Sequence, residues 1–324
     1  MNKLKKLILA KLGVEYTYPK IKRDVLSLVK TYDIPEIETT QIDIVMPTFN
    51  RLKQTKRTIE NLYKLYTQDK FNLILVDNKS NDGTGEYLNI LKGNYSNIKV
   101  IHLDSNLGGA GARNEGLKYV KNEYVAFLDN DIYIMPGYFE NLIKTLEDED
   151  KTTIAAQSKV VMPNGLIQIN RPFYVIENKW IIFQDLDFEK DFKEPSAEIS
   201  QSLNWTPSGA TLWRSEIFEK YSFDLTLGTY YEDNEFSFRL NKEGYEFKNN
   251  HKAICLHYSS AFVPDESSDK SYSEGRFGKD AIKQALKNFY KKHRLFLVYG
   301  DTEGHVKYLG FNSIEEYKNF ISNT

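Results

Sequence analysis

The sequence contains one cysteine, no long apolar run and almost no net charge. Cys255 cannot form a disulfide within the chain, so an internal disulfide framework is excluded and a reducing compartment is compatible. No stretch approaches the roughly 20 apolar residues that a transmembrane helix needs. A formal net charge of −2 provides no global field that would attract nucleic acid. These absences predict a cytoplasmic globular protein that does not bind nucleic acid.

The first part of the chain alternates between short apolar runs and amphipathic stretches of helical length. We expect strands over residues 42–46, 71–76, 98–103 and 124–128, each followed by a helix, over residues 51–66, 83–91, 109–120 and 137–146. Strands and helices that alternate at this spacing predict βαβ units and a mostly parallel sheet. The predicted fold class is therefore α/β.

Beyond residue 150 the alternation stops, and longer strands or hairpins are expected. The predicted strands cover residues 154–161, 166–169, 173–183 and 253–256, and the predicted helices cover 215–220, 232–242, 279–292 and 313–321. Residues 295–299 and 305–309 are expected to pair as a hairpin. The polar, acidic segment 184–201 is expected to be a mobile loop, and residues 261–276 are expected to be a loop or lid.

Asp129, Asn130 and Asp131 directly follow the predicted strand over residues 124–128. In open α/β sheets, ligands bind at the carboxyl ends of the strands. Carboxylates placed one residue apart suit Mg²⁺ or Mn²⁺ that is shared with phosphates. The alternative is a turn or helix cap, because Asp and Asn favour both positions.

Two more polar clusters follow the first two predicted strands and are expected at the same edge. Residues 47–51 read Pro-Thr-Phe-Asn-Arg, and residues 77–84 read Asp-Asn-Lys-Ser-Asn-Asp-Gly-Thr. Asp77 is able to accept a hydrogen bond from the imide N–H of uracil or thymine. The alternative is ordinary turn chemistry, because Asn, Asp, Ser and Gly all favour turns.

A glycine-rich stretch over residues 106–116 follows the third predicted strand. A turn of this kind at the start of a helix holds phosphate through backbone N–H groups and the helix dipole. Arg113 offers a bidentate guanidinium to a diphosphate. The spacing is not that of the dinucleotide-binding fingerprint. The alternative is that the small residues allow this helix to pack closely on the sheet.

Together these segments resemble the family 2 glycosyltransferases, which have a GT-A fold. The matching segments are Pro-Thr-Phe-Asn-Arg at 47–51, Val-Asp-Asn-x-Ser-x-Asp-Gly-Thr at 76–84, Asn-x-Gly-Gly-Ala-x-Ala-Arg-Asn-x-Gly at 106–116, Leu-Asp-Asn-Asp at 128–131, Pro-Ser-Gly-Ala at 207–210, Glu-Asp at 232–233 and Ile-Cys-Leu-His at 254–257. The resemblance covers about residues 41–260. It is closest to the branch that contains rhamnosyl- and galactofuranosyltransferases.

The resemblance implies a role for each matching residue. Asp131 and His257 would bind Mn²⁺ or Mg²⁺ on the donor diphosphate, and Asp233 would be the catalytic base. The base site would be lined by Pro47, Thr48, Arg51 and Asp77, with Arg113 near the base or diphosphate and Asp129 and Asn130 facing the ribose. The full set of implied substrate-binding residues is Pro47, Thr48, Arg51, Asp77, Asn78, Arg113, Asp129, Asn130, Trp205, Gly209, Ala210 and Glu232.

Each of these roles has a plainer alternative. A single histidine on a strand, such as His257, is usually a packed residue. Glu232 and Asp233 alone would suggest only a solvated helix face, and because adjacent helical residues point ~100° apart, only one of them can be the base. Trp205 and Trp213 either stack on sugar or belong to the core.

The implied activity is inverting transfer of a hexosyl or deoxyhexosyl group from a UDP- or dTDP-sugar to a glycan hydroxyl. The acceptor would be a glycan or a lipid-linked glycan, in the synthesis of a surface polysaccharide or of glycoprotein glycans. Two other classes stay open. One is a sugar-nucleotide nucleotidyltransferase, although residues 47–51 replace the glycine-rich loop that such enzymes carry there. The other is a non-catalytic protein that binds glycans or nucleotides.

We expect a GT-A domain over residues 41–260, with a nucleotide-binding half over 41–135 and an acceptor half over 136–260. An N-terminal extension over residues 1–40 precedes it, and a lid loop with a C-terminal helical extension over 261–324 follows it. Both extensions carry a predicted basic amphipathic helix. These helices are expected either to rest on the anionic inner face of a membrane, or to pack on the domain or form a homodimer contact.

Overall fold

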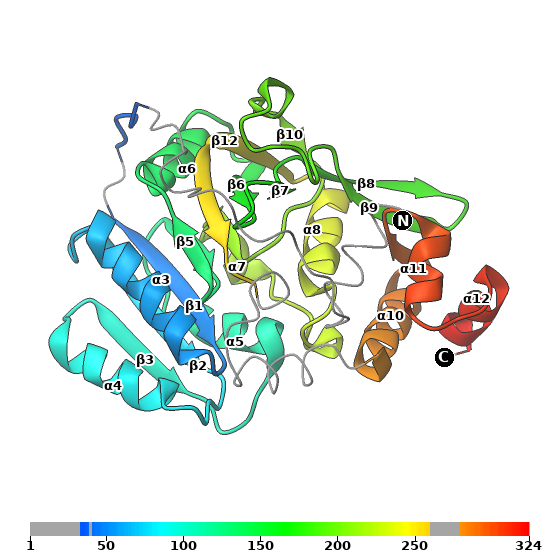
Figure 1. The fold of residues 1–324 in the computed structure, drawn as a ribbon, viewed down its shortest axis with the longest axis horizontal. Helices are drawn as coiled ribbons and strands as arrows, with labels where there is room; N and C mark the ends of the chain where they lie inside the picture. Colours follow the sequence, from blue (N-terminus) through cyan, green and yellow to red (C-terminus); the bar gives the residue numbers. More distant parts are fainter. Residues whose placement is uncertain (1–32, 39–40, 260–278, 324) are drawn as a thin grey trace.

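A computed structural model describes residues 33–38, 41–259 and 279–323 (Figure 1). The amphipathic helix expected near the amino terminus and the loop or lid expected over residues 261–276 lie outside the described residues. Within the described ranges, no helix has both the length and the apolar character needed to cross a membrane.

The central sheet begins with four parallel strands, as the sequence predicts. The first elements are β1 (Ile42–Thr48), α3 (Leu52–Leu65), β2 (Phe71–Asp77), α4 (Thr84–Asn94), β3 (Ile98–His102), α5 (Gly108–Leu117), β4 (Tyr124–Leu128), β5 (Ile132–Ile134) and α6 (Tyr138–Glu147). Strands β3, β2, β1 and β4 lie side by side in this order, and each pairing is parallel. The predicted α/β fold is therefore confirmed, and β1, β2 and β4 end at one edge of the sheet (Figure 1).

The rest of the sheet is mixed in direction. Its strands are β6 (Thr153–Val161), β7 (Ile167–Ile169), β10 (Ser202–Leu203), β11 (Ala210–Arg214) and β12 (Glu246–His257), with the helices α7 (Ile217–Lys220), η2 (Leu225–Leu227) and α8 (Glu232–Lys242) between the last two. Strand β11 runs antiparallel between β4 and β6, so its first residue, Ala210, pairs with the last residue of β4. Strand β12 is longer than predicted and bends between Asn250 and Ile254, and its last residue, His257, pairs with β5. These registers bring the end of β4, the start of β5, the start of β11 and the end of β12 to the sheet edge where Asp131 lies.

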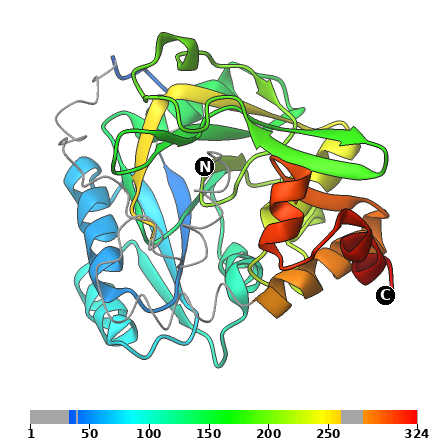
Figure 2. The same cartoon turned by 45° about the vertical axis from the view of Figure 1, so that its right-hand side comes forward.

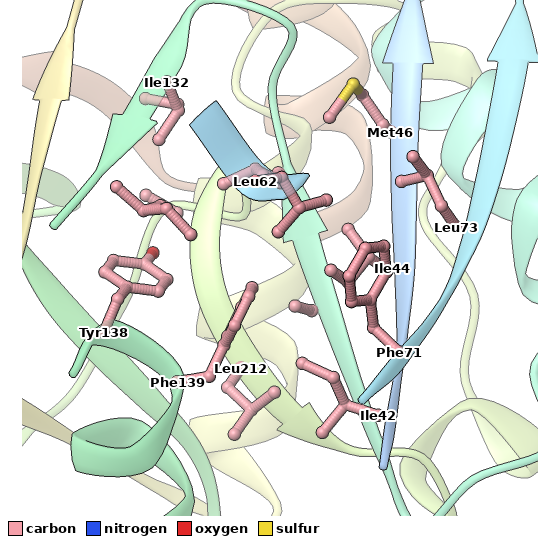
Figure 3. Close-up of a cluster of buried hydrophobic side chains, with 14 of the residues drawn as sticks. Ile42, Ile44, Met46, Leu62, Phe71, Leu73, Ile132, Tyr138, Phe139 and Leu212 are labelled. Atoms are coloured by element: carbon pink, nitrogen blue, oxygen red, sulfur yellow. The ribbon is translucent and has the colours of Figure 1, made fainter. Parts of the chain in front are cut away.

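Helices cover both faces of the sheet, which explains why its strands are apolar on both sides. On one face, Ile44 packs in a cluster with Leu62 of α3 (Figure 3). On the other face, Val45 packs with Ala112 of α5. A Cβ added at Gly116 would lie 2.4 Å from a methyl group of Val45, so α5 needs a glycine there to approach the sheet. The glycine-rich stretch therefore serves close packing, at least at this position.

The C-terminal residues 279–323 form a second core with a small sheet. The elements are β8 (Pro172–Glu177), β9 (Trp180–Asp185), β13 (Phe296–Tyr299), α10 (Lys279–His293), α11 (Thr302–Tyr308) and α12 (Ile314–Ser322). Strand β13 pairs parallel to β9, which joins the C-terminal segment to the preceding part of the chain (Figure 2). The predicted hairpin of residues 295–299 with 305–309 is wrong. The second of these segments lies mostly in α11, because Asp301 caps that helix by accepting from the Gly304 N–H at 2.8 Å.

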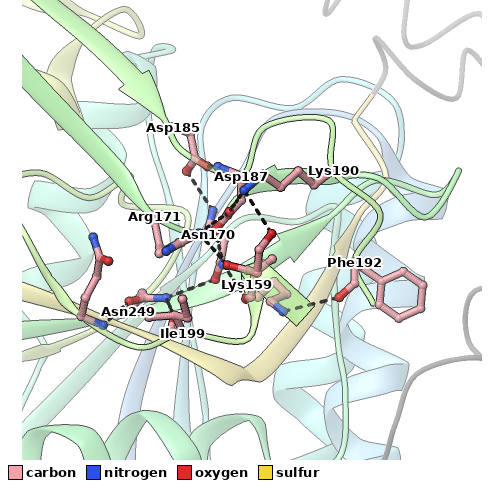
Figure 4. Close-up of polar contacts among 12 residues, drawn as sticks. Lys159, Asn170, Arg171, Asp185, Asp187, Lys190, Phe192, Ile199 and Asn249 are labelled. Atoms are coloured by element: carbon pink, nitrogen blue, oxygen red, sulfur yellow. Dashed lines mark hydrogen bonds and ion pairs between the residues drawn. The ribbon is translucent and has the colours of Figure 1, made fainter. Parts of the chain in front are cut away.

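Residues 184–201, expected to be a mobile loop, are held by a buried polar network (Figure 4). The Asp187 carboxylate is fully buried, and it accepts from Arg171 Nε and Nη2, both at 2.6 Å. Asn170 Nδ2 and Lys190 Nζ also donate to it, at 2.7 and 2.8 Å. The segment includes the short helix η1 (Pro195–Ala197). It is irregular, as predicted, but a buried ion pair anchors it to the strands beside it.

Candidate functional site

The residues singled out from the sequence gather at the carboxyl edge of β1, β2 and β4. Asp129 and Asp131 follow β4, and α8 begins with Glu232 and Asp233. His257 reaches the same edge as the last residue of β12. The side chains form two groups, one around the buried carboxylate of Asp131 and one around the half-buried carboxylate of Asp233.

The first group, the Asp131 centre, consists of Arg51, Asp131, Gln168 and His257. Asp131 Oδ2 lies 2.6 Å from Arg51 Nη1 and 3.3 Å from His257 Nε2. Burial acts to raise the pKa of Asp131, but the neighbouring His257 and Arg51 outweigh it and hold that pKa well below its usual range. The Asp131 carboxylate is therefore ionised.

The orientation of His257 suits a metal ligand. Its Nδ1 lies 2.7 Å from Gln168 Oε1, and because an amide oxygen only accepts, Nδ1 carries the hydrogen. Nε2, on the other side of the ring, lies 3.3 Å from Asp131 Oδ2 and would bind a metal only without a hydrogen, while Nδ1 keeps its outer hydrogen bond to Gln168. An outer hydrogen bond of this kind is the usual support of a metal-bound histidine. The described ranges contain no cluster of three or more His, Cys, Asp or Glu side chains suited to a metal. Binding of a divalent ion by Asp131 and His257 stays a prediction, and it would need further ligands such as phosphate and water oxygens.

Arg51 reaches Asp131 from a left-handed turn that the next loop holds in place. Asn50 and Arg51 have φ values of 54° and 63°, which cost a residue other than glycine about 1–3 kcal/mol. The Asn50 N–H donates to Ser80 Oγ at 2.8 Å, and the Asn81 N–H donates to Asn50 Oδ1 at 2.9 Å. Arg51 is fully buried, so its role here is to orient Asp131. Contact between Arg51 and a nucleotide base stays a prediction.

Asp77 and Asn78 lie at the edge, as expected, but their side chains are engaged in turn contacts. The Asp77 carboxylate accepts from the Ser80 N–H at 2.9 Å and lies 2.9 Å from His102 Nδ1. The Asn78 amide makes two hydrogen bonds to the backbone of residues 107–108, just before α5. The turn interpretation thus accounts for both side chains, and recognition of the base by Asp77 stays a prediction.

Pro47, Thr48 and Asn130 also reach the edge. Thr48 Oγ1 donates to the backbone of β2 at 3.0 Å. Asn130 Nδ2 donates to Thr55 Oγ1 at 2.9 Å, so the Asn130 amide faces α3. Contact of Asn130 with the ribose therefore stays a prediction, and the structure shows a bond that orients the loop after β4.

The second group, the Asp233 centre, consists of Arg113, Asp129, Glu232 and Asp233. Arg113 bridges two carboxylates, with Nη2 2.8 Å from Asp129 Oδ1 and Nη1 3.3 Å from Glu232 Oε1. Gly209 makes this possible, because a Cβ added there would lie 2.2 Å from Asp129 Oδ2. The predicted site glycine is thus required by the close approach of a carboxylate to the chain.

Asp233 differs from the carboxylates around it. Its Oδ1 accepts from the Asn234 N–H at 2.9 Å, and the Ser208 N–H also donates to the carboxylate. Burial raises the pKa of Asp233, and the opposing charge of Arg113 and these two hydrogen bonds do not cancel that effect. Because Glu232 is paired with Arg113, Asp233 is the carboxylate better suited to accept a proton.

The two tryptophans lie in the hydrophobic core. Trp213 packs against Phe236, with ring centroids 5.6 Å apart, and Trp205 packs edge-on against Phe183 at 5.3 Å. Both are almost fully buried, so the structure does not support the expected stacking on sugar. Ala210 is buried as well, and it shapes the site through its pairing beside the end of β4.

Sequence reasoning did not single out Gln168 or the backbone N–H of Ser208. Gln168 lies between Ile167 and Ile169 on β7, and that alternation was the signal for one polar side chain facing away from the core. The partner of its side chain, His257, is 89 residues away along the chain, so the contact itself leaves no local pattern.

The chain is similar to known glycosyltransferases. Residues 43–197 match the family model for glycosyl transferase family 2. The chain is 27% identical over 217 residues to the poly(ribitol-phosphate) beta-N-acetylglucosaminyltransferase TarP of Staphylococcus aureus, covering 65% of this chain and 61% of TarP. It is 36% identical over 96 residues to a poly(ribitol-phosphate) beta-glucosyltransferase of Bacillus spizizenii, covering 29% of this chain and 15% of that protein. The chain thus spans less than two thirds of the length of these relatives.

A solved structure shares the fold. The mannosyltransferase PcManGT from Pyrobaculum calidifontis, solved in complex with GDP-Man and Mn²⁺, superposes with a TM-score of 0.54 at 17% identity. The match covers 91% of this chain and 74% of that one, and it agrees with the GT-A-like arrangement of the sheet. Residues 43–197 are therefore part of a GT-A-like fold and are similar to the glycosyl transferase family 2 model.

Proposed function

We propose that the protein transfers a sugar from a nucleoside-diphosphate sugar to a hydroxyl of a glycan polymer, with inversion at the anomeric carbon. One observation carries the proposal: Arg113 links Asp129, two residues before Asp131, to Glu232, the neighbour of Asp233. A carboxylate suited to a cation and a carboxylate suited to a proton thus share one sheet edge. The relatives named for poly(ribitol-phosphate) favour a polymeric acceptor.

In the proposed reaction, Asp233 is the general base. The acceptor hydroxyl attacks the anomeric carbon, its proton passes to the Asp233 carboxylate, and the bond to the diphosphate breaks with its electrons on the leaving oxygen. A raised pKa makes Asp233 a stronger base near neutral pH than an exposed aspartate. The transition state is expected to be oxocarbenium-like, as in other glycosyl chemistry.

Asp131 and His257 would hold the divalent ion, which when bound would neutralise charge on the leaving diphosphate. Arg51 keeps the Asp131 carboxylate in place through the 2.6 Å ion pair. Gln168 holds a hydrogen of His257 on Nδ1 and so directs Nε2 toward Asp131, where it would bind the ion once it has lost its own hydrogen. Both supports act on the two residues that would bind the ion.

Turnover of defined donors tests the proposal. UDP-glucose, UDP-N-acetylglucosamine, dTDP-rhamnose and GDP-mannose would each be incubated with the full chain, Mn²⁺ and poly(ribitol-phosphate). We expect one donor to release its nucleoside diphosphate, with loss of release in EDTA or in Asp233→Asn. Glu232→Gln is the matched control, because it alters the adjacent carboxylate. Release of pyrophosphate from a nucleoside triphosphate, or binding of donors without turnover, would overturn the proposal.

Membrane contact and dimer formation by the basic helices remain proposals of lower weight. The apolar face of α10 is buried in the C-terminal core, through Ile282, Leu286 and Phe289. Packing on the domain therefore explains this helix. Contact of α10 with an anionic surface would depend on the lysines of that helix.

A further inference from the structure

The C-terminal residues 279–323, beyond the family match, hold the helix that carries Asp233. Lys292 Nζ and His293 Nε2 at the end of α10 lie 2.7 and 3.1 Å from Glu235 Oε1. Strand β13 then follows beside β9, and its last residue is Tyr299 (Figure 2). The segment thus contacts α8 at Glu235, in the first turn of that helix.

Tyr299 touches the residues on both sides of Glu232 and Asp233. Its hydroxyl donates to Asn234 Oδ1 at 2.6 Å. Its ring stacks on the ring of Tyr231, with centroids 6.0 Å apart and planes at 28°. Tyr299 therefore contacts both chain neighbours of the Glu-Asp pair.

Both contacts bear on the direction of the Asp233 carboxylate. Tyr231 is the residue before α8 and has φ 62°, an unfavourable conformation that neighbouring packing must maintain. Asn234 donates its backbone N–H to Asp233 Oδ1 at 2.9 Å. A shift of either residue would turn the first turn of α8 and move the carboxylate.

The charges around the hydroxyl agree with this role. Burial raises the pKa of the Tyr299 phenol far above its usual value, and the charges of Asp233 and Glu232 raise it further. The phenol therefore stays neutral and keeps its hydrogen for Asn234. The other charged groups that act on Asp233 are Arg113 and Asp129.

We propose that Tyr299 is a positioning residue of the catalytic site, supplied by the C-terminal segment, which fixes the start of α8 and so aims Asp233 at the acceptor hydroxyl. This inference rests on the proposed function, because it needs Asp233 to be the base. It assigns to the C-terminal segment a part in the reaction that the family-matched residues 43–197 do not contain.

The chain offers a matched control on the same helix. Tyr174 Oη donates to Asn241 Oδ1 at 2.7 Å, an equivalent phenol–amide bond seven residues further along α8. Tyr174→Phe and Tyr299→Phe each remove one hydroxyl and keep the ring. A general loss of stability would affect both variants, whereas misorientation of the Asp233 carboxylate should occur only in Tyr299→Phe.

The test measures kcat, donor KM and the pH profile of kcat with the donor that turns over in the panel above. We expect Tyr299→Phe to lower kcat about tenfold, within the effect of lost supporting contacts, to leave donor KM unchanged and to shift the acidic limb of the profile. Asn234→Ala, which removes the acceptor of the same bond, should reproduce the shift. Tyr174→Phe should keep the wild-type kcat and profile.

Two outcomes would overturn the inference: a wild-type profile in Tyr299→Phe, or an equal loss of kcat in Tyr174→Phe. Failure of the proposed function looks different. If Asp233→Asn keeps its turnover, the base is misassigned whatever Tyr299 does. If Asp233→Asn is inactive and Tyr299→Phe is unchanged, only the inference about Tyr299 fails.

Discussion

Asp131 and Asp233 are both enclosed carboxylates at one sheet edge, yet their surroundings act on them in opposite directions. Asp131 lies against Arg51 and His257, and its pKa is held low. Asp233 has two backbone N–H groups and a more distant Arg113, so burial prevails and its pKa is raised. Carboxylates whose pKa values are pushed apart in one site are suited to different tasks. One stays ionised for a cation, and the other accepts a proton.

The two centres also differ in which part of the chain supports them. Arg51 and Gln168, the supports of the Asp131 centre, lie inside the family-matched residues 43–197. Ser208 and Tyr299, which support the start of α8, lie outside them. The residues that support the start of α8 thus come from parts of the chain that the family model does not cover.

The largest expected effect is on the Asp131 centre. Asp131→Asn keeps the side-chain volume but removes the charge, so we expect turnover to fall below detection and the free energy of unfolding to drop, because Arg51 is left as a buried cation. Breaking such a pair costs about 3–5 kcal/mol. Asp187→Asn is the control, since Asp187 forms another buried ion pair, with Arg171 at 2.6 Å. Equal loss of turnover in Asp187→Asn would reduce the effect to stability alone.

The next effect concerns the Asp233 centre. Asp233→Asn preserves the shape but cannot accept the proton, and loss of a general base typically lowers the rate ~10²–10⁴-fold. We expect kcat to fall by that factor in steady-state assays, with donor affinity nearly unchanged. Normal turnover in Asp233→Asn together with an inactive Glu232→Gln would mean that the two carboxylates have exchanged roles.

A smaller effect is expected where the two centres meet. In Gly209→Ala the new Cβ would lie 2.2 Å from Asp129 Oδ2, so Asp129 must move and its ion pair with Arg113 must open. Misplacement of about 1 Å near a reacting centre can cost ~10²-fold in rate. Gly93→Ala is the control, because a Cβ there meets nothing within 4 Å on the surface of α4. If kcat is unchanged in both variants, the Arg113–Asp129 ion pair has no role in turnover.

The smallest expected effect is on the free energy of unfolding. It tests the ion pairs that join α10 to Glu235 of α8. Burial would raise the pKa of Glu235, but its contacts with His293, Arg239 and Lys292 lower it to about 2. Because this pKa is below its unfolded value, the carboxylate stabilises the fold above about pH 4.5, and this contribution is lost as pH falls toward about pH 2. Between pH 6 and pH 3 the loss is about 2 kcal/mol.

Glu235→Gln should remove this pH dependence. Denaturant unfolding of wild type and variant at pH 6 and pH 3 measures it. The wild type should lose about 2 kcal/mol more than the variant over that interval. Equal losses would show that α10 contributes no ion pair of consequence to α8.

Much of the sheet edge around the Asp131 centre could be predicted, because the sequence patterns that mark it are local. Strands such as β1 and β4 are short apolar runs between polar turns, and the parallel order places their carboxyl ends together. The strand order therefore predicted that Asp77 and Asp131 share one edge, whereas Asp233 and His257 were singled out by the resemblance to family 2 glycosyltransferases. What the sequence could not reveal was which oxygen or nitrogen each of them faces.

The surroundings of the Asp233 centre, by contrast, depend on contacts between segments that are distant in the sequence. Residues 305–309 are too few to distinguish a strand from a helix by periodicity, and the cap at Asp301 decides for α11. The pairing of β13 with β9 joins residues more than a hundred positions apart. The Tyr299–Asn234 hydrogen bond joins residues 65 positions apart, so no sequence pattern near either residue predicts it.

Ligand-induced thermal stabilisation separates the two centres most directly. Wild type, Asp131→Asn and Asp233→Asn would be heated with Mn²⁺ and, in turn, UDP, dTDP or GDP, since a ligand that binds only the folded state raises the Tm. The account predicts that one nucleotide stabilises wild type and Asp233→Asn equally, needs Mn²⁺, and leaves Asp131→Asn unchanged. Stabilisation of Asp131→Asn by Mn²⁺ and nucleotide, or its loss in Asp233→Asn, would contradict the division of tasks between the two carboxylates.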